Sequence, residues 1–230
     1  MIPIITLDGP SSTGKGTICN KLANYLKWNK LESGNFYRFL IYFAKKKKIN
    51  LNNTNELIKF SLYIIKKFQK KSYRTWNILF KNENILNIIR GEQYAKYASK
   101  LGSNILIRKA LIDSQRSFAT NPGLVTDGRD MGTVIFPKAI LKIYLYASIE
   151  VRSYRRFLQL RNQNKKINFY KIFYDLKIRD LRDTYRFFSP MKPAKDAILI
   201  DTTQLTVVQV FKNILELINN IKLHNYFFKK

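Results

Sequence analysis

The feature that most constrains the fold lies near the N-terminus, where an apolar run leads directly into a glycine-rich loop and a lysine. Residues 2–7 read Ile-Pro-Ile-Ile-Thr-Leu, and residues 8–17 read Asp-Gly-Pro-Ser-Ser-Thr-Gly-Lys-Gly-Thr. Gly9, Gly14 and Lys15 stand at the G-x-x-x-x-G-K spacing of a phosphate-binding loop. In such a loop the backbone N–H groups point inward, and the next helix adds the positive end of its dipole. The sequence therefore predicts a buried strand, this loop, and a helix from Thr17 to about Lys27.

Lys15 is placed to act as a point charge on the β- and γ-phosphates of a nucleotide. The usual motif has Ser or Thr directly after the lysine, where its hydroxyl helps to hold Mg²⁺. Here Gly16 takes that place and Thr17 follows. The G-K-G-T form resembles the nucleoside monophosphate kinases, in which Thr17 would take the hydroxyl role. This resemblance points away from GTPases and motor ATPases.

Length and composition predict one globular domain. The 230 residues can bury a core, and 46% hydrophobic with 14% aromatic residues argues against disorder. No apolar stretch is long enough to span a bilayer, and no leader precedes the first strand, so we expect a cytoplasmic protein. The one cysteine, Cys19, is expected to pack in the core of a protein from a reducing compartment. The lone His224 leaves no histidine metal site to consider.

The formal net charge of +27 would suit a protein that binds nucleic acid or an anionic membrane. The lysines are spread along the chain, however, often beside Asn and Ile, as in the run Lys45–Lys48. We interpret this as surface composition and expect a monomer with no specific nucleic-acid partner and no membrane partner. The charge would still attract nucleotides, and RNA at low salt. A basic nucleic-acid-binding protein without turnover remains the alternative from a different class.

Strand and helix patterns alternate, which predicts a parallel α/β sheet. Between two helical stretches, residues 73–80 and 85–89 flank the polar segment 81–84, and this pattern favours a small hairpin inserted into the α/β order. After the first strand we expect a short strand end and turn within residues 30–38, followed by strands at 124–126, 139–147 and 197–201. After the first helix we expect a second one that runs to about residue 47. Further helices are expected at 54–70, 93–99, 104–119, 150–161, 169–182 and 206–223.

A charged cluster follows the predicted strand 124–126, where the chain reads Asp127-Gly128-Arg129-Asp130. Ligands of parallel sheets bind at the carboxyl ends of the strands. Phosphoryl transfer needs a carboxylate for the metal and arginines that grip phosphates in fork geometry. Asp127 is therefore a candidate Mg²⁺ ligand and Arg129 a candidate phosphate contact. The alternative is a tight turn with solvated charges.

Arginines also recur on the two predicted helices of residues 150–182. On the second, Arg179, Arg182 or Asp183, and Arg186 are spaced to share one face. One interpretation is a solvent face with salt bridges, and the other is a mobile arginine lid over a nucleotide. The first helix adds Arg152, Arg155 and Arg156.

Together these segments resemble bacterial cytidylate kinases over nearly the whole chain, to about residue 220. The similarity is carried by GPSSTGKGT, ESGNFYR, GRDMGTVIFP and RDLRDTYRFFSP, in this order and spacing, with the insertion between them and a final strand and helix. GRDMGTVIFP is the most specific segment. The resemblance implies a P-loop NTPase-type parallel β-sheet core flanked by helices, with a small CMP-binding insertion and a short lid.

The resemblance further implies ATP-dependent phosphorylation of CMP and dCMP with Mg²⁺, held by Thr17 and Asp127. Lys15, Arg129 and Arg179 would be catalytic, neutralising the charge that develops on the phosphates. ATP would be bound by Gly9, Pro10, Ser11, Ser12, Thr13, Gly14, Lys15, Gly16, Thr17 and Arg155. CMP would be bound by Ser33 and Arg38 at the sugar and phosphate, by Ser99, Arg108 and Asp130 at cytosine, by Arg129 and Arg179 at phosphate, and by Asp183 and Arg186 at the sugar.

Within one kinase domain, the resemblance implies a core at 1–31, 121–149 and 189–230, a CMP-binding region at 32–120 and a lid at 150–188. Two departures stand out. Glu32 occupies a place where the family usually has Asp, and the insertion near residues 73–90 is short. A monophosphate kinase with another acceptor, such as UMP or AMP, is the alternative enzyme.

Overall fold

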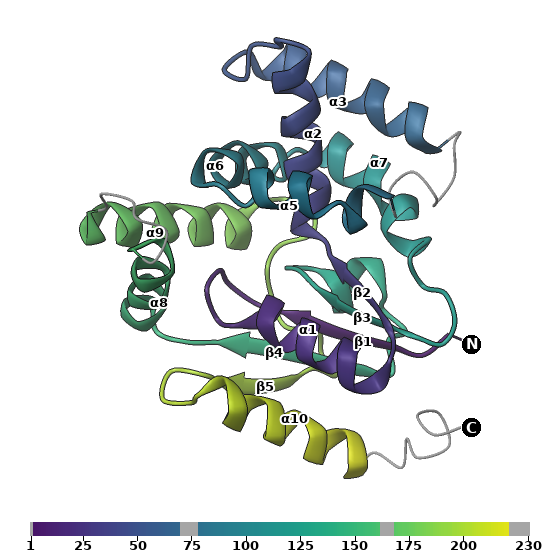
Figure 1. The fold of residues 1–230 in the computed structure, drawn as a ribbon, viewed down its shortest axis with the longest axis vertical. Coiled ribbons are helices and arrows are strands. Elements are labelled where there is room, and N and C mark those ends of the chain that lie inside the picture. The colour runs from purple at the N-terminus through teal and green to yellow at the C-terminus, as the bar shows by residue number, and fades with distance from the viewer. Residues whose placement is uncertain (1, 70–77, 162–167, 221–230) are drawn as a thin grey trace. The chain divides into compact units, whose positions relative to one another are not determined.

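The computed structural model of the chain describes residues 2–69, 78–161 and 168–220 (Figure 1). The chain divides into two compact units. The first unit is Met1–Leu31 with Ala119–Lys230, and the second unit is Glu32–Phe118. Within the described ranges, no helix has both the length and the apolar character that a membrane span requires.

A five-stranded sheet forms the centre of the first unit, in the order β2-β3-β1-β4-β5. The pairs β1–β3, β1–β4 and β4–β5 are parallel, with Leu7 of β1 opposite Asp127 of β3 and Ile143 of β4. The predicted parallel α/β core is therefore confirmed. The strands are β1 (Ile4–Asp8), β2 (Asn29–Glu32), β3 (Leu124–Asp127), β4 (Leu141–Tyr146) and β5 (Ile198–Asp201).

The main core of the first unit packs on the apolar residues of this sheet. Ile5, Leu7 and Leu145 are each 0% exposed, and they share a cluster with residues of α1 (Lys15–Leu26) and α10 (Val207–Asn220). Cys19 lies in the same cluster, 0% exposed, which confirms its predicted core position. The core thereby holds α1, and with it the end of the phosphate loop, against the sheet.

Two further helices of the first unit, α8 (Ile149–Arg161) and α9 (Phe169–Tyr185), pack against each other. Leu160, Ile172 and Leu176 form a small apolar cluster there, with Phe157 packed on it. The polar contacts of this helix pair are described with the site below.

The second unit is helical among its described residues (Figure 1). Its rings pack in a cluster in which Phe36, Phe80 and Phe118 have centroids 5.0 to 5.7 Å apart. Asn104 begins one helix by accepting the N–H groups of Leu106 and Ile107. The helices are α2 (Gly34–Lys46), α3 (Thr54–Gln69), α5 (Glu83–Ile89), α6 (Glu92–Leu101) and α7 (Ile105–Arg116).

The predicted hairpin is wrong in its second half, because residues 78–81 and 83–89 are helical. Asn82 accepts the N–H of Ile85 and so starts α5. Leu86 and Ile89, three positions apart, are buried, which is the spacing of one helix face. The short apolar run fits a helix as well as a strand, and the Asn cap favours the helix. Residues 73–77 of the predicted first strand lie outside the described residues.

Candidate active site

Two glycines give the phosphate loop its shape. Gly9 has φ +133°, and a Cβ on it would lie 2.0 Å from the carbonyl oxygen of Leu145, so only glycine fits between β1 and β4. Gly14 has φ +92° and is the residue before α1. The first turn of α1 carries no acidic side chain. The positive end of its dipole is therefore available to an anion in the loop.

Lys15 is the first residue of α1, and it is only 5% exposed. Its ammonium donates to the carbonyl of Pro10 and, at 3.3 Å, to the hydroxyl of Thr13, so it spans the loop. Burial lowers the pKa of Lys15 well below its ordinary value, and the positive charge of Arg129 lowers it further. Asp127 acts in the opposite direction. A negatively charged ligand in the loop would act in the same direction as Asp127 and favour the charged ammonium.

Arg129 joins the phosphate loop to α9. It donates to the hydroxyl of Ser11 at 2.7 Å and to Oδ2 of Asp183 at 3.0 Å, and it also reaches the carbonyl of Gly128 at 3.1 Å. The guanidinium fork thus contacts the loop and the helix at once. The charged cluster after β3 is therefore part of a network rather than a solvated turn.

Asp183 is the acidic centre of this network and is 6% exposed. Burial alone would raise the pKa of its carboxyl, but neighbouring guanidinium groups outweigh burial and hold that pKa below its ordinary value. The groups are those of Arg129, Arg179 and Arg186. An ionised Asp183 therefore holds three of the predicted substrate-binding arginines close to one carboxylate.

The helix α9 ends at Tyr185, so Arg186 follows the helix instead of sharing its face as the spacing predicted. Arg186 has φ −64° and ψ 138°, and its side chain turns back to Oδ1 of Asp183 at 3.4 Å. Arg186 is 9% exposed. Of the two interpretations of this arginine run, the solvent face is wrong for Asp183 and Arg186.

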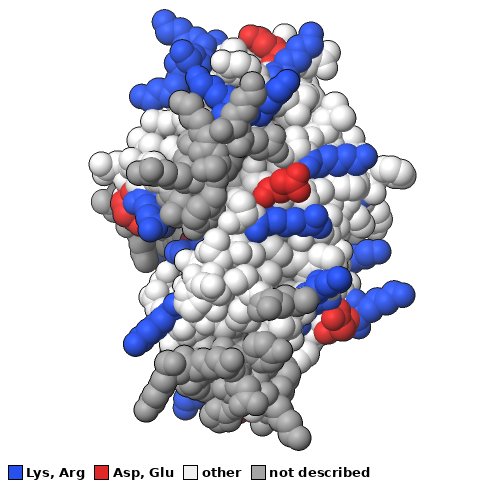
Figure 2. All heavy atoms as spheres, turned by 90° about the vertical axis from the view of Figure 1, so that its right-hand side faces the viewer, with Lys and Arg blue, Asp and Glu red and all other residues white. Residues whose placement is uncertain are grey.

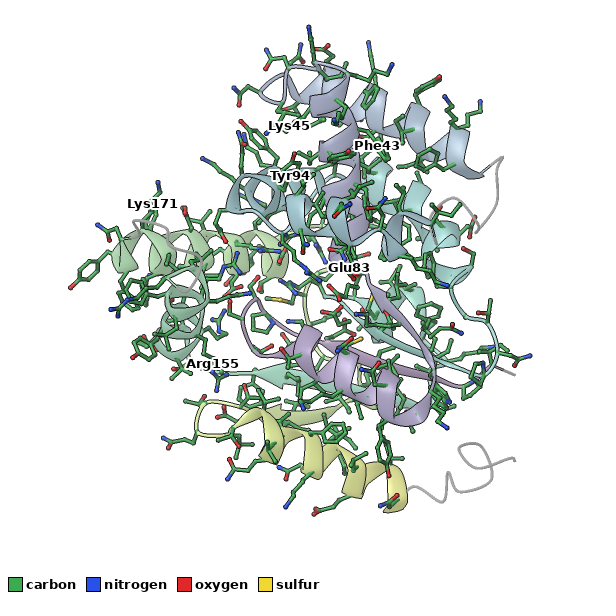
Figure 3. The ribbon with its side chains drawn as sticks, viewed as in Figure 1. Phe43, Lys45, Glu83, Tyr94, Arg155 and Lys171 are labelled. Carbon is green, nitrogen blue, oxygen red and sulfur yellow. The ribbon has the colours of Figure 1, made fainter. Side chains whose placement is uncertain are left out.

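Arg152 and Arg155 of α8 make different contacts in the first unit. The Arg152 guanidinium, 6% exposed, donates to Asp180 of α9 and, at 3.4 Å, to the carbonyl of Ser11. Arg155 lies beside the segment after β5 (Figure 3), where it donates to the hydroxyl of Thr202 at 3.1 Å. That hydroxyl in turn donates to the carbonyl of Thr13 at 3.3 Å. Arg155 is thus connected to the phosphate loop through one residue.

The end of β3 places oxygen atoms beside the start of α1. A Cβ on Gly16 would lie 4.0 Å from Oδ2 of Asp127, and Thr17 is exposed in the same turn. A carboxylate and a hydroxyl are ligands that suit Mg²⁺, which is commonly held by one or two carboxylates and substrate phosphates. Across the described ranges no group of three or more His, Cys, Asp or Glu side chains could hold a metal by itself. The donor set therefore fits a metal that arrives with a nucleotide.

Four of the predicted site residues belong to the second unit. Ser33, Ser99 and Arg108 are buried, at 5 to 8% exposure. Arg108 donates to the carbonyl of Gly102 at 2.9 Å, and its guanidinium lies 5.7 Å from the ring centre of Tyr37. The fourth, Arg38, donates to the carbonyl of Ile89 at 2.7 Å.

Asp8 lies directly before the phosphate loop, and the sequence pattern assigned it no role. Both of its carboxylate oxygens accept backbone N–H groups, from Met131 at 2.9 Å and Gly132 at 2.7 Å. Burial raises the pKa of Asp8 to about 6, although these two bonds and Lys15 favour its charge. An acidic residue at the end of a buried strand already suggests that it has a polar partner. The partners lie 123 and 124 residues away in the sequence, so spacing does not identify them.

Comparison with known proteins gives one consistent family. The family model described as cytidylate kinase matches residues 5–220. A Pseudomonas fluorescens protein named cytidylate kinase is 41% identical over 214 residues, which are 93% of this chain and 93% of that protein. One of the same name from Colwellia psychrerythraea is 39% identical over 94% of this chain and 96% of its own length. A third, from Pseudomonas syringae pv. syringae, is 42% identical over 93% of each chain.

Proposed function

The chain belongs to the cytidylate kinase family, and we propose that it transfers the terminal phosphoryl group of ATP to CMP or dCMP. The products are ADP and CDP or dCDP. It is a nucleoside monophosphate kinase, and no covalent enzyme intermediate is needed. The observation that carries this function is the phosphate loop with Lys15 buried beneath it, joined through Arg129 and Asp183 to the arginines of α9.

In this proposal Gly9–Thr17 binds the ATP phosphates through backbone N–H groups, the start of α1 and the Lys15 ammonium. Thr17 and Asp127 would hold Mg²⁺, which would supply positive charge to neutralise the phosphate oxygens. Lys15, Arg129 and Arg179 stabilise the charge that builds up on the transferred group. Arg155 completes the ATP site beside Thr202. The support for these roles is that the guanidinium groups of Arg129 and Arg179 lie close enough to the buried Lys15 to lower its pKa.

The acceptor nucleotide in this proposal is CMP or dCMP. Cytosine offers an N4 amino donor together with N3 and O2 acceptors, so a carboxylate, a hydroxyl and a guanidinium match it. Asp130, Ser99 and Arg108 supply those three groups, and all are buried. The other proposed CMP contacts are Ser33, Arg38, Arg129, Arg179, Asp183 and Arg186. Residues 32–120 act as the CMP-binding region and residues 150–188 as a lid, in a cytoplasmic monomer.

A panel of acceptors at fixed ATP and Mg²⁺ tests this function. Coupled ADP release is measured with CMP, dCMP, UMP and AMP, and we expect CMP and dCMP to be the preferred acceptors. A clear preference for UMP or AMP would contradict the proposed acceptor. RNA binding at physiological salt with no kinase activity toward any of the four would favour the nucleic-acid-binding alternative.

Asp130 is expected to determine which acceptor is used. A carboxylate accepts from the cytosine N4 amino group, whereas UMP presents a carbonyl there, and a buried polar group left unpaired discriminates strongly. We expect Asp130→Ala to raise the KM for CMP at least about tenfold, a loss of roughly 1.4 kcal/mol. The CMP-over-UMP ratio of kcat/KM should shrink while the KM for ATP changes little. An equal rise of both KM values would make Asp130 a metal or structural carboxylate instead.

The lysine run Lys45–Lys48 is expected to be dispensable. All four side chains are exposed, and Lys45 contacts Gln93 at 2.8 Å and the ring of Tyr94 at 4.9 Å (Figure 3). Figure 2 shows more basic than acidic side chains on the viewed face, as expected for a net charge of +27. Exposed charges are screened beyond roughly 8 Å at physiological salt.

Replacing the four lysines with glutamine should therefore leave CMP turnover at about 150 mM salt within about threefold of wild type. The comparison is made by coupled ADP release, with a melting curve for each protein. A collapse of activity in a variant that still folds would show that the run takes part in function.

A further inference from the structure

Asp8 makes a contact that crosses most of the length of the chain. It is the last residue of β1, directly before Gly9 of the phosphate loop, and it is 5% exposed. Its two carboxylate oxygens accept from the amides of Met131 and Gly132, at 2.9 and 2.7 Å. These amides open η1 (Met131–Ile135), a short π-helical turn. The first N–H groups of such a turn have no partner within it, so a side chain from β1 satisfies them.

The turn η1 begins directly after Asp130, the proposed cytosine contact. The Asp130 carbonyl accepts from the amides of Val134 at 2.9 Å and Ile135 at 3.2 Å, which ties it to the far end of the turn. Asp8 holds the near end, through the two amides that follow Asp130. The hydrogen bonds of Asp8 therefore fix the backbone next to Asp130. Asp8 can do this without contacting a nucleotide itself.

Gly132 allows this approach. A Cβ there would lie 2.9 Å from the hydroxyl of Thr6, 3.2 Å from Cδ of Lys142 and 3.3 Å from Oδ2 of Asp8. Each of these distances is shorter than an ordinary van der Waals contact. The amide of residue 132 is thus pressed against the sheet at the point where Asp8 receives it. The contact therefore depends on the carboxylate of Asp8 and on the absence of a side chain at Gly132.

We infer that Asp8 is a positioning residue for acceptor selectivity, which acts by fixing residues 131–132 and through them the carboxylate of Asp130. This inference rests on the proposed function, because it takes Asp130 as the residue that reads cytosine. The last residue of β1 would then contribute to the choice of acceptor nucleotide as well as supporting the phosphate loop. An asparagine at position 8 would keep the shape and one acceptor but would turn an amide donor toward a backbone N–H.

The first test compares Asp8→Asn with wild type on CMP, UMP and ATP. We expect the KM for CMP to rise about tenfold and the CMP-over-UMP ratio to fall, with the KM for ATP within about threefold, since one bond to a buried group is lost. Asp196→Asn is the matched control. Asp196 also accepts hydrogen bonds in this unit, but from Lys142 and not from η1, and we expect no change beyond about twofold. A KM for ATP that rises as much as that for CMP would overturn the inference.

The second test is a double variant. If Asp8 acts through Asp130, then Asp8→Asn combined with Asp130→Ala should have the CMP-over-UMP ratio of Asp130→Ala alone. A merely structural role for Asp8 would make the two losses multiply, which would overturn the inference.

Gly132→Ala decides the matter if Asp8→Asn does not fold, because it crowds the same amide from the other side and should reproduce the selectivity loss. Gly91→Ala, whose nearest neighbour would be at 3.5 Å, is its control and should leave selectivity unchanged. Unchanged selectivity in Gly132→Ala would overturn the inference. Wild type is measured in the same assay. A wild-type enzyme that does not prefer CMP would refute the proposed function. If wild type is active and selective for CMP but the variants are unaffected, only the role of Asp8 is refuted.

Discussion

Replacing Lys15 with methionine is expected to lower kcat with CMP about 100- to 1000-fold, the usual loss when one preorganised electrostatic donor is removed. Methionine keeps most of the length of the lysine stem and removes only the charge and its hydrogen bonds. The ammonium lies within the loop, on the carbonyl of Pro10 and the hydroxyl of Thr13. Its charge is therefore placed where charge moves during transfer. Coupled ADP release at saturating ATP and CMP measures the effect.

The same variant should be no less stable than wild type near pH 7.5. Burial lowers the pKa of Lys15 in the folded protein. A lysine whose folded pKa is lowered opposes folding at every pH below its unfolded pKa of 10.5. Losing the charge removes that opposition. The expected result is thus a large loss of rate without a loss of melting temperature in the absence of nucleotide.

Lys21→Met is the matched control for Lys15→Met, because Lys21 lies on the same helix but is exposed, with its ammonium 6.0 Å from the ring of Phe211. Its activity should stay within about twofold, as expected for an exposed surface charge. If Lys15→Met keeps activity within about tenfold of wild type, Lys15 does not stabilise the transition state.

The parts of the fold that follow from neighbouring residues could be predicted from the sequence. The strand, loop and helix at residues 4–26 depend on an apolar run, two glycines and a lysine that stand close together in the chain. The cluster after β3 could be assigned to the sheet edge because parallel strands present their carboxyl ends on one side. The sequence of residues 83–89 does not decide between a helix and a strand. A run of Ile and Leu as short as this one fits both periodicities, and an Asn cap decides between them.

The contacts that assemble the site could not be read from spacing. Asp183 is 54 residues from Arg129, and Asp180 is 28 residues from Arg152. A charge run on a helix is usually solvated, so the pattern alone left the arginines of α9 open to two interpretations. Burial of Asp183 and Arg186 settles their environment, since charges are seldom buried without partners. Tertiary packing, which brings α9 to the loop, supplies that information.

Arg129→Met is expected to lower kcat/KM for CMP at least about 100-fold, because it removes a charge-assisted contact that serves the loop and α9 together. The methionine leaves Ser11 without its 2.7 Å donor and Asp183 without its 3.0 Å partner. Arg129→Lys keeps the charge but not the fork that reaches both groups at once. Its activity should lie between those of Arg129→Met and wild type, closer to the methionine variant.

Arg129→Met should also destabilise the protein at neutral pH, by roughly 1–3 kcal/mol, since a buried carboxylate loses one of its partners. The pKa of Asp183 is lowered in the folded state, so its ionised form stabilises folding above its unfolded value of 3.8, and this is lost as pH falls through the folded value. The difference in unfolding free energy between wild type and the variant should therefore be full at pH 7 and shrink below about pH 4. Urea unfolding at a series of pH values measures it. A difference that stays constant down to pH 3 would mean that Arg129 stabilises the fold by packing alone, and that its ion pair with Asp183 does not hold α9 to the phosphate loop.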